Sequence, residues 1–287
     1  MRERAQRFDP RQHMHSHTFE IFHYREPRRD EVQVHHHDFY EVYCFLGGEV
    51  EYWVEGHTYR LRSGDLLLIH PMEFHRPVIK NDGSVYERIV LWIDREYLEQ
   101  LSEEGVDLTR CFDAQLPTHT NLLRPSSAQR QTLLARLSEL VRESYSTEYG
   151  AAACARGLLL QLMAEINRVA LQADARRQAK DNASPLVTRV VAYIGDHYSE
   201  PLSLETLAAR FYVSKYHLSH EFSRTVGTSV YRYLLLKRLF VARQQLLSGM
   251  PAGEVCNSCG FGDYTVFYRA FKAEYGISPR ACAAGEG

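Results

Sequence analysis

The chain has 287 residues, of which 45% are hydrophobic and 24% charged, a composition typical of soluble globular proteins with about two domains. Its charged N-terminus lacks a following apolar stretch, and its apolar runs are far shorter than the ~20 residues that cross a bilayer. We therefore expect no signal peptide, no membrane span and a cytoplasmic protein.

The net charge of −2 is divided unevenly along the chain. Residues 185–287 carry 11 Lys and Arg against 8 Asp and Glu, whereas residues 1–184 carry 23 against 28. A mildly basic C-terminal part behind an acidic N-terminal part is a weak indication of nucleic-acid binding at the C-terminal end.

The N-terminal half predicts a small all-β domain. Apolar and polar residues alternate from about residue 32 to 93, and glycine turns recur at short intervals. Many short antiparallel strands with such turns indicate a small barrel or jelly roll. His13, His15 and His17 precede the strands on an irregular arm, where we expect them to be exposed. The predicted strands include residues 42–46, 50–54, 59–61 and 66–69.

Two histidine-rich pieces lie within this domain. His35, His37 and Glu41 form an HxHxxxE pattern, and His75 follows a second set of turn residues. Positions 35 and 37 share parity, so on one strand their side chains point to the same face. Three imidazoles and a carboxylate suit zinc, iron, nickel or copper. The alternatives are a metal-free small-molecule pocket, in which these groups bond to each other or to water, and a purely structural role.

The spacing of these residues resembles the two motifs of the cupin fold over about 50 residues. The resemblance implies that His35, His37, Glu41 and His75 occupy cupin metal-ligand positions, which would hold a divalent transition metal in the barrel. Arg29 and Glu73 depart from the motifs, which have glycine there. Such barrels attached to a DNA-binding tail often sense sugars without a metal. We therefore expect an effector pocket lined by His35, His37, Glu41, Tyr43 and His75.

The middle of the chain predicts two amphipathic helices. Residues 94–125 mix helical and loop signals, and Ser126 or Ser127 can then cap the first helix. In similar chains such helices often carry a dimer interface, so we expect a homodimer. Residues 173–184 are polar, lack apolar periodicity and predict a linker. Apolar residues recur at helical spacing at Leu133, Leu137, Leu140 and Val141, and again at Leu158, Leu159, Leu162, Ile166 and Val169.

The C-terminal part predicts a first helix-turn-helix unit. Ser203 can cap a short helix, and Ser214 can cap a second helix over residues 215–224. Leu218 and Phe222 lie four residues apart and should be buried together. A long helix over residues 229–247 follows the break at Gly227. Its predicted apolar stripes are Tyr231, Leu235, Leu239, Ala242 and Leu246, and Leu236, Phe240 and Leu247.

A second helix-turn-helix unit follows the long helix. Gly260 can take the left-handed conformation that ends one helix, and Asp263 can cap the next. The intervening helix of about 19 residues spans about 28 Å, near the ~34 Å repeat of duplex DNA. Two recognition helices on this helix would therefore reach successive major grooves.

Residues 186–280 resemble the DNA-binding domain of AraC/XylS-type transcription regulators along their whole length. The first turn departs from the pattern with Tyr212 in place of glycine, Ala252 is smaller than usual, and Cys282-Ala283 replaces an aromatic-arginine pair. Cupin-like barrels are common N-terminal partners of this domain. The matching positions include Leu207-Ala208, Ser214, Leu218-Ser219, Phe222, Gly227, Lys237-Arg238, Gly260-Phe261, Phe267, Phe271-Lys272, Gly276 and Ser278-Pro279.

The DNA contacts expected from this geometry fall into two classes. Arg269 is the strongest base-reading candidate, because a guanidinium can bond to O6 and N7 of guanine together. The other predicted base-edge readers are Tyr216, Ser219, His220, Tyr264, Thr265 and Tyr268. The predicted phosphate contacts are Lys215, Arg224, Arg238 and Lys272.

The six cysteines are scattered and predict reduced thiols. Cys256 and Cys259 alone form a CxxC pair, which supplies too few ligands for a four-coordinate zinc site. We interpret them as small packing residues in preference to a redox switch.

These features together predict a two-domain α+β chain, with a cupin-like β-barrel (jelly roll) plus helices and an all-α domain with two helix-turn-helix units. The expected function is a transcription regulator, not an enzyme, that binds double-stranded DNA and responds to a sugar or related hydroxylated ligand. RNA polymerase is a further expected partner. The alternatives are a cupin metalloenzyme and a metal-responsive regulator. The domains are predicted as residues 1–125 (barrel and arm), 126–172 (helical pair), 173–184 (linker) and 185–287 (DNA-binding domain).

Overall fold

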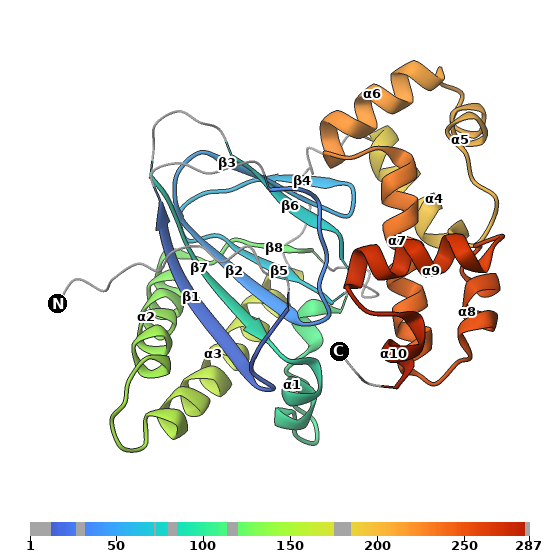
Figure 1. Ribbon diagram of the computed structural model, residues 1–287. Helices are drawn as coiled ribbons and strands as arrows, with labels where there is room; N and C mark the ends of the chain where they lie inside the picture. Colours follow the sequence, from blue (N-terminus) through green and yellow to red (C-terminus); the bar gives the residue numbers. More distant parts are fainter. Residues whose placement is uncertain are drawn as a thin grey trace. The chain divides into compact units, whose positions relative to one another are not determined.

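The computed structural model describes residues 13–26, 32–71, 73–79, 85–113, 120–174 and 185–284. The chain divides into two compact units (Figure 1). Strands β1–β8 and helices α1–α3 form the first unit, and helices α4–α10 form the second. The predicted two-domain α+β class is confirmed.

The strands of the first unit are β1 (Phe19–Glu26), β2 (Tyr40–Gly47), β3 (Val50–Val54), β4 (His57–Arg60), β5 (Leu66–Ile69), β6 (His75–Ile79), β7 (Tyr86–Ile93) and β8 (Leu122–Leu123). Its helices are α1 (Arg95–Leu101), the short 3₁₀ turn η1 (Arg110–Phe112), α2 (Ser127–Ser144) and α3 (Ala151–Asp174). Because α3 continues to Asp174, the predicted linker starts two residues too early. The rest of that linker, residues 175–184, lies outside the described residues.

Two antiparallel sheets form the β part of this unit. Five strands run in the order β1-β7-β2-β5-β8, and three run in the order β4-β3-β6. Side chains alternate across the larger sheet, so Ile89 and Leu91 of β7 pack in one cluster with Leu159 and Ile166 of α3. Tyr86, Val90 and Trp92 face the other way and pack with residues of β3. The larger sheet is thus buried on both faces, with helices outside and the smaller sheet inside.

Of the two serines predicted to cap α2, Ser126 is the N-cap. The side chain of Ser126 accepts from the backbone N–H of Gln129, and the Gln129 side chain accepts from the Ser126 N–H. This capping box satisfies two N–H groups that the helix leaves without partners. Ser127 is the first helical residue.

The second unit consists, in its described residues, of helices and their connecting turns. The helices are α4 (Pro185–His197), α5 (Leu204–Arg210), α6 (Lys215–Val226), α7 (Val230–Leu247), α8 (Ala252–Ser258), α9 (Tyr264–Tyr275) and α10 (Pro279–Ala283). Among the described residues, no helix is both long enough and apolar enough to cross a membrane.

Helix α7 is the long helix predicted between the two helix-turn-helix units, but its stripes are partly wrong. Tyr231 is 72% exposed and Leu247 is 50% exposed. The buried ring near the start of α7 belongs to Tyr233, which meets Phe222 of α6 edge-on at 5.6 Å between ring centroids. Farther along, Leu239 and Leu246 join the core formed with α8 and α9. One end of α7 therefore packs against each helix-turn-helix unit, and Tyr231 is exposed.

Candidate functional site

Both helix-turn-helix units use the same turn. The N–H groups of Tyr212 and Val213 bond to the carbonyls of Ala209 and Ala208 at the end of α5, at 3.2 and 3.0 Å. At the end of α8, Gly260 and Phe261 repeat this pattern onto Asn257 and Cys256, at 3.1 and 3.0 Å. These paired bonds form a Schellman motif, which needs one residue in the left-handed conformation.

That left-handed residue differs between the two turns. It is Tyr212, with φ +56°, in the first turn and Gly260, with φ +76°, in the second. Tyr212 is 94% exposed, so its side chain has room. A Cβ at Gly260 would lie 2.4 Å from the carbonyl oxygen of Ser199, so only glycine fits there. The predicted helix-stopping role of Gly260 is confirmed, and the close approach to Ser199 adds a second reason for it.

The second helix of each unit is capped and terminated in the same way. The Ser214 hydroxyl accepts from His217 N–H at 3.1 Å at the start of α6, and Asp263 accepts from Val266 N–H at 2.9 Å at the start of α9. Each helix ends at a left-handed glycine, Gly227 or Gly276. The chain therefore presents two helices of equal length with matched ends.

Helix α6 buries one face and exposes the other. Leu218, Phe222 and Val226 are buried, whereas Tyr216 is 81% exposed. The predicted readers Tyr216 and His220 stack with 6.2 Å between their ring centroids. Ser219 is half-buried, and Lys215, His220 and Arg224 are exposed.

Helix α9 repeats this division. Phe267 and Phe271 are buried in the core of the second unit. The residues predicted to contact DNA lie together on the exposed part of the helix; they are Tyr264, Thr265, Tyr268, Arg269 and Lys272.

Two of the predicted phosphate contacts already have acidic neighbours. Lys215 Nζ lies 2.9 Å from Glu205 Oε1, and Arg224 Nη2 lies 2.7 Å from Glu221 Oε2. The hydrogen bond with Glu221 raises the pKa of Arg224, and that with Lys215 lowers the pKa of Glu205. Exposed pairs of this kind contribute little to stability. Both cations can therefore exchange a carboxylate for a phosphate at small cost.

Arg238 does not fit its predicted role as a phosphate contact. Its Nε donates to the carbonyl of Tyr198 and its Nη2 to the carbonyl of Glu200, each at 2.7 Å. It lies half-buried on α7 and not on either of the capped helices. Because these two donors are used within the unit, we correct its assignment to a structural contact.

The two cysteines of the CxxC pair are buried in the core of the second unit. Cys256 Sγ approaches the Phe261 carbonyl at 3.6 Å, and Cys259 Sγ approaches Gln245 Oε1 at 3.5 Å. Burial raises the pKa of Cys259 to about 11. A thiol kept protonated in a core is unreactive, which supports the packing interpretation.

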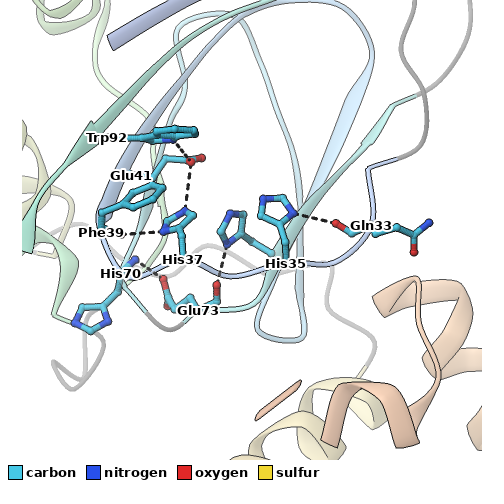
Figure 2. Close-up of polar contacts among 9 residues, drawn as sticks. Gln33, His35, His37, Phe39, Glu41, His70, Glu73 and Trp92 are labelled. Atoms are coloured by element: carbon cyan, nitrogen blue, oxygen red, sulfur yellow. Dashed lines mark hydrogen bonds and ion pairs between the residues drawn. The ribbon is translucent and has the colours of Figure 1, made fainter. Parts of the chain in front are cut away.

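A second site lies in the first unit, where His37, Glu41 and His75 converge. Figure 2 shows His37 and Glu41 of this site beside Trp92. Their ligand atoms all lie within 4.8 Å of one another, and all three side chains are buried. Glu41 Oε2 lies 3.4 Å from His37 Nε2 and accepts from the indole N–H of Trp92 at 2.9 Å. Burial alone would raise the pKa of Glu41, but contacts with His37, His35 and Trp92 hold it below its usual value.

The backbone fixes which nitrogen each histidine turns into the site. Nδ1 of His37 lies 2.9 Å from the carbonyl oxygen of Phe39, and Nδ1 of His75 lies 2.8 Å from that of Glu73. A carbonyl can only accept, so each Nδ1 donates to its carbonyl and each Nε2 is the nitrogen turned into the site. Neither buried Nε2 makes a hydrogen bond to another described residue. Two imidazole lone pairs beside a carboxylate are a donor set suited to a transition metal or to a ligand hydroxyl.

His35 lies beside this group but not within the 4.8 Å that joins its three members. Residue 35 forms an isolated β-bridge and residues 36–39 lie outside any strand, so residues 35 and 37 do not share a strand and the parity argument fails. His35 instead pairs with His75 through their backbones, and its Nδ1 lies 2.9 Å from the Gln33 carbonyl oxygen. Its ring stands 4.3 Å from the His75 ring. Burial lowers the pKa of His35 to about 4, which leaves it neutral at pH 7.

The three arm histidines lie at the surface, as expected. His13, His15 and His17 are exposed, and the rings of His13 and His15 lie 5.1 Å apart. They lie apart from the group formed by His37, Glu41 and His75.

Further polar side chains point into the same interior. Tyr43, already predicted, places its hydroxyl 2.5 Å from that of Tyr86. Arg88 is only 3% exposed and lies over the rings of Tyr24 and Tyr86, with 4.6 and 4.3 Å to their centroids. Its Nη1 lies 3.5 Å from Glu26 Oε2. The sequence interpretation missed Arg88, Trp92, Tyr52 and Tyr86, although alternation along residues 86–93 would have assigned three of them to one face.

Comparison with known proteins follows the same division of the chain. A family model of an AraC-like ligand binding domain matches residues 16–163, and one of a helix-turn-helix domain matches residues 207–284. The HTH-type transcriptional activator RhaS of Escherichia fergusonii is 26% identical over 252 residues, which cover 88% of this chain and 87% of that protein. RhaS of Salmonella arizonae is 28% identical over 258 residues, with 89% of each covered. Among solved structures, the DNA-binding domain of AdpA in complex with a target DNA matches 36% of this chain and 93% of its own length, at 31% identity and a TM-score of 0.34.

Proposed function

This chain belongs to the AraC family of DNA-binding transcription regulators with a ligand-binding domain, and from that premise we propose that α6 and α9 bind operator DNA under the control of a small molecule held between the two sheets. The observation that carries the proposal is the matched pair of capped helices, each with a buried apolar face and an exposed aromatic and basic face. Such helices enter successive major grooves.

The proposed division of roles follows the exposed residues. Tyr216, Ser219 and His220 of α6 and Tyr264, Thr265, Tyr268 and Arg269 of α9 read base edges. Lys215, Arg224 and Lys272 neutralise phosphates, which fixes register without reading sequence. Because the similar RhaS proteins are transcriptional activators, the proposed output is activation, with RNA polymerase as a further proposed partner. A regulator that binds operator DNA works where the DNA is, which we propose is the cytoplasm.

The proposed effector is a sugar or related hydroxylated ligand. His37, Glu41, Tyr43 and His75 offer acceptors and hydroxyls that can bond to hydroxyl groups, and aromatic rings around them offer apolar faces. Arg88 lies in the same interior and suits an acidic substituent on such a ligand. Helices α2 and α3, which cover the outer face of the sheet, are the proposed dimer interface, and light scattering on the eluted protein measures the oligomeric state.

Two linked measurements test this function. Selection from a random duplex library with the full-length protein should enrich one sequence with two half-sites. A thermal-shift screen against sugars and sugar acids should then identify a compound whose stabilisation rises with its concentration, as binding to the folded state requires. A library that shows no enrichment with folded protein would refute the proposed DNA binding.

A metal-responsive regulator is the second candidate, favoured by the two buried Nε2 atoms of His37 and His75 that converge on the Glu41 carboxylate. His37, Glu41 and His75 would hold a divalent transition metal, which would supply a Lewis-acid contact for a ligand oxygen. The residues fit this donor set, and metal analysis of untagged protein tests it. We propose binding and not catalysis as the role of this interior; turnover of sugars by the metal-loaded protein would instead support the metalloenzyme alternative.

A further inference from the structure

Three segments of the second unit meet at Arg238. Its guanidinium donates to the carbonyls of Tyr198 and Glu200, in the turn after α4, each at 2.7 Å. It also lies 6.0 Å from the ring centroid of Phe261, in the turn of the second helix-turn-helix unit. One side chain on α7 therefore contacts the lead-in to the first unit and the turn of the second.

The backbone of the second turn, at Gly260, approaches the same segment at Ser199. The position of a Cβ at Gly260 falls 2.4 Å from the carbonyl oxygen of Ser199 and 2.8 Å from its carbonyl carbon. Ser199 lies between the two residues that Arg238 holds. The segment 198–200 is thus contacted both by Arg238 and by the Gly260 turn.

The chemistry of this contact favours a fixed geometry. A guanidinium presents several N–H groups in a rigid fork, which sets the positions of both carbonyls at once. These carbonyls follow the C-terminal end of α4, where a positive charge is favoured by the helix dipole. The turn itself is short, because Glu200 N–H bonds to His197 and Leu202 N–H bonds to Glu200, at 3.0 and 2.8 Å. It leads directly to Ser203, which caps α5.

Apart from this contact, the two helix-turn-helix units have separate hydrophobic cores. Phe222 packs on Tyr233 near the start of α7, whereas Leu239 and Leu246 pack with Phe267 and Phe271 in the other core. A helix held at each end by a different core fixes distance better than rotation, because small adjustments in packing at either end turn one unit about the helix axis. A second tie between the units restricts that rotation.

We propose that Arg238 and Gly260 are positioning residues that hold the two helix-turn-helix units at one separation and rotation, so that the protein accepts half-sites at a single spacing. This inference rests on the proposed DNA binding. Two linked readers bind more tightly than one only when both reach their sites together. One inserted base pair rotates a half-site by about 34–36° and moves it along the duplex.

The test measures the dependence of affinity on half-site spacing. The first probe is the duplex enriched from a random library by the full-length parent protein. The second probe carries one extra base pair between the half-site bound by α6 and the half-site bound by α9 of the same chain. The parent should lose more than about 20-fold in affinity on the insertion, whereas Arg238→Ala should lose less than about 3-fold. Single half-site probes should bind both proteins within about 3-fold, because the reading helices themselves are unchanged.

Further variants keep the test decisive if Arg238→Ala fails to fold. Arg238→Lys retains the charge but lacks the fork that bridges two carbonyls, and Gly260→Ala forces the second turn away from Ser199. Both should tolerate the insertion as Arg238→Ala does. Arg243→Ala is the matched control, because Arg243 lies on the same helix and faces the ring of Tyr275 at 5.6 Å; it should keep the penalty of the parent.

The inference is overturned if the folded variants at Arg238 and Gly260 keep the full spacing penalty of the parent. Loss of binding to single half-sites would also overturn it, since that would place Arg238 in contact with DNA. A parent protein that enriches no sequence would instead refute the proposed DNA binding, and this inference with it.

Discussion

The indole N–H of Trp92 on β7 donates to Oε2 of Glu41 on the neighbouring strand β2, at 2.9 Å and inside the buried interior. Trp92→Phe removes this donor and leaves a buried carboxylate oxygen with one partner fewer. We expect the free energy of unfolding to fall by ~1–3 kcal/mol, the usual cost of an unsatisfied buried group. Urea denaturation of the full chain measures it. In the background of Glu41→Gln the loss should shrink, and equal losses in both backgrounds would show that packing, not the hydrogen bond, sets the cost.

Loss of any one of the three converging side chains should weaken metal binding if the site takes a metal. We expect His37→Gln, Glu41→Gln and His75→Gln each to lower the affinity for Zn²⁺ or Co²⁺ by at least about 10–100-fold, since all three supply direct ligands. His35→Gln is the matched control and should change the affinity by less than about 3-fold, because His35 stands outside the group. Competition against a coloured chelator measures the metal affinity of these variants and of the control. Equal losses at residues 35 and 37 would restore the four-ligand site.

Arg269→Ala and Lys272→Ala on α9 should separate base reading from phosphate contact. We expect Arg269→Ala to weaken binding to the selected DNA by ~1–3 kcal/mol and to relax the preference at one base position. Lys272→Ala should weaken binding to all sequences alike and reduce the slope of log affinity against log salt by about 1. Fluorescence anisotropy at several salt concentrations distinguishes the two. An Arg269→Ala protein that footprints like its parent would remove Arg269 from the readers.

Tyr212→Gly should stabilise the protein. The left-handed conformation costs a non-glycine residue about 1–2 kcal/mol, and glycine costs about 0.5–1 kcal/mol in unfolded-chain entropy. The net gain should therefore be about 0.5–1 kcal/mol, measured by thermal or urea unfolding. Asn tolerates this conformation, so Tyr212→Asn should gain as well, whereas Tyr212→Val should lose stability. A destabilised glycine variant would mean that the exposed ring makes a contact within the folded protein.

Cys154 should react with a thiol reagent much faster than the other five cysteines. It is the exposed one, while Cys44, Cys111, Cys256, Cys259 and Cys282 are buried. Burial raises the pKa of Cys111 and Cys44, the latter to about 12, so little reactive thiolate forms. Mass spectrometry after brief labelling should find one modified site in the native parent and none in Cys154→Ser. Rapid labelling of Cys256 or Cys259 would revive the redox interpretation.

Local signals in the sequence predicted the second unit well. Ser203, Ser214 and Asp263 cap helices as expected, because a cap depends on a side chain and on N–H groups three residues away. Glycine at a helix end carries the same kind of local information. Each of these interactions is closed within one turn of chain, so the sequence alone contains both partners.

Contacts between distant segments account for the wrong predictions. Nothing near Arg238 in the sequence indicates Tyr198 and Glu200, some 38–40 residues away, so its charge was interpreted as a DNA contact. His35 and His37 were predicted to share one strand, whereas only the backbone of His35 pairs, with that of His75. Trp92 and Arg88 were missed because their interior position depends on which face of β7 the helices cover.

The five-stranded sheet, buried on both faces, makes the interior and the outer helices share single strands. On β7, Trp92 bonds to Glu41 inside, while its neighbours Leu91 and Ile93 pack in the outer cluster with α2 and α3. A ligand that displaces the backbone at Trp92 also shifts those neighbours, because a single planar peptide joins each of them to it. Information about ligand occupancy can thus reach the helical layer through the wall of the site itself. Conservative changes on the face of β7 that packs against the helices, such as Leu91→Val, should alter the response of DNA binding to the ligand, although Leu91 does not contact the ligand.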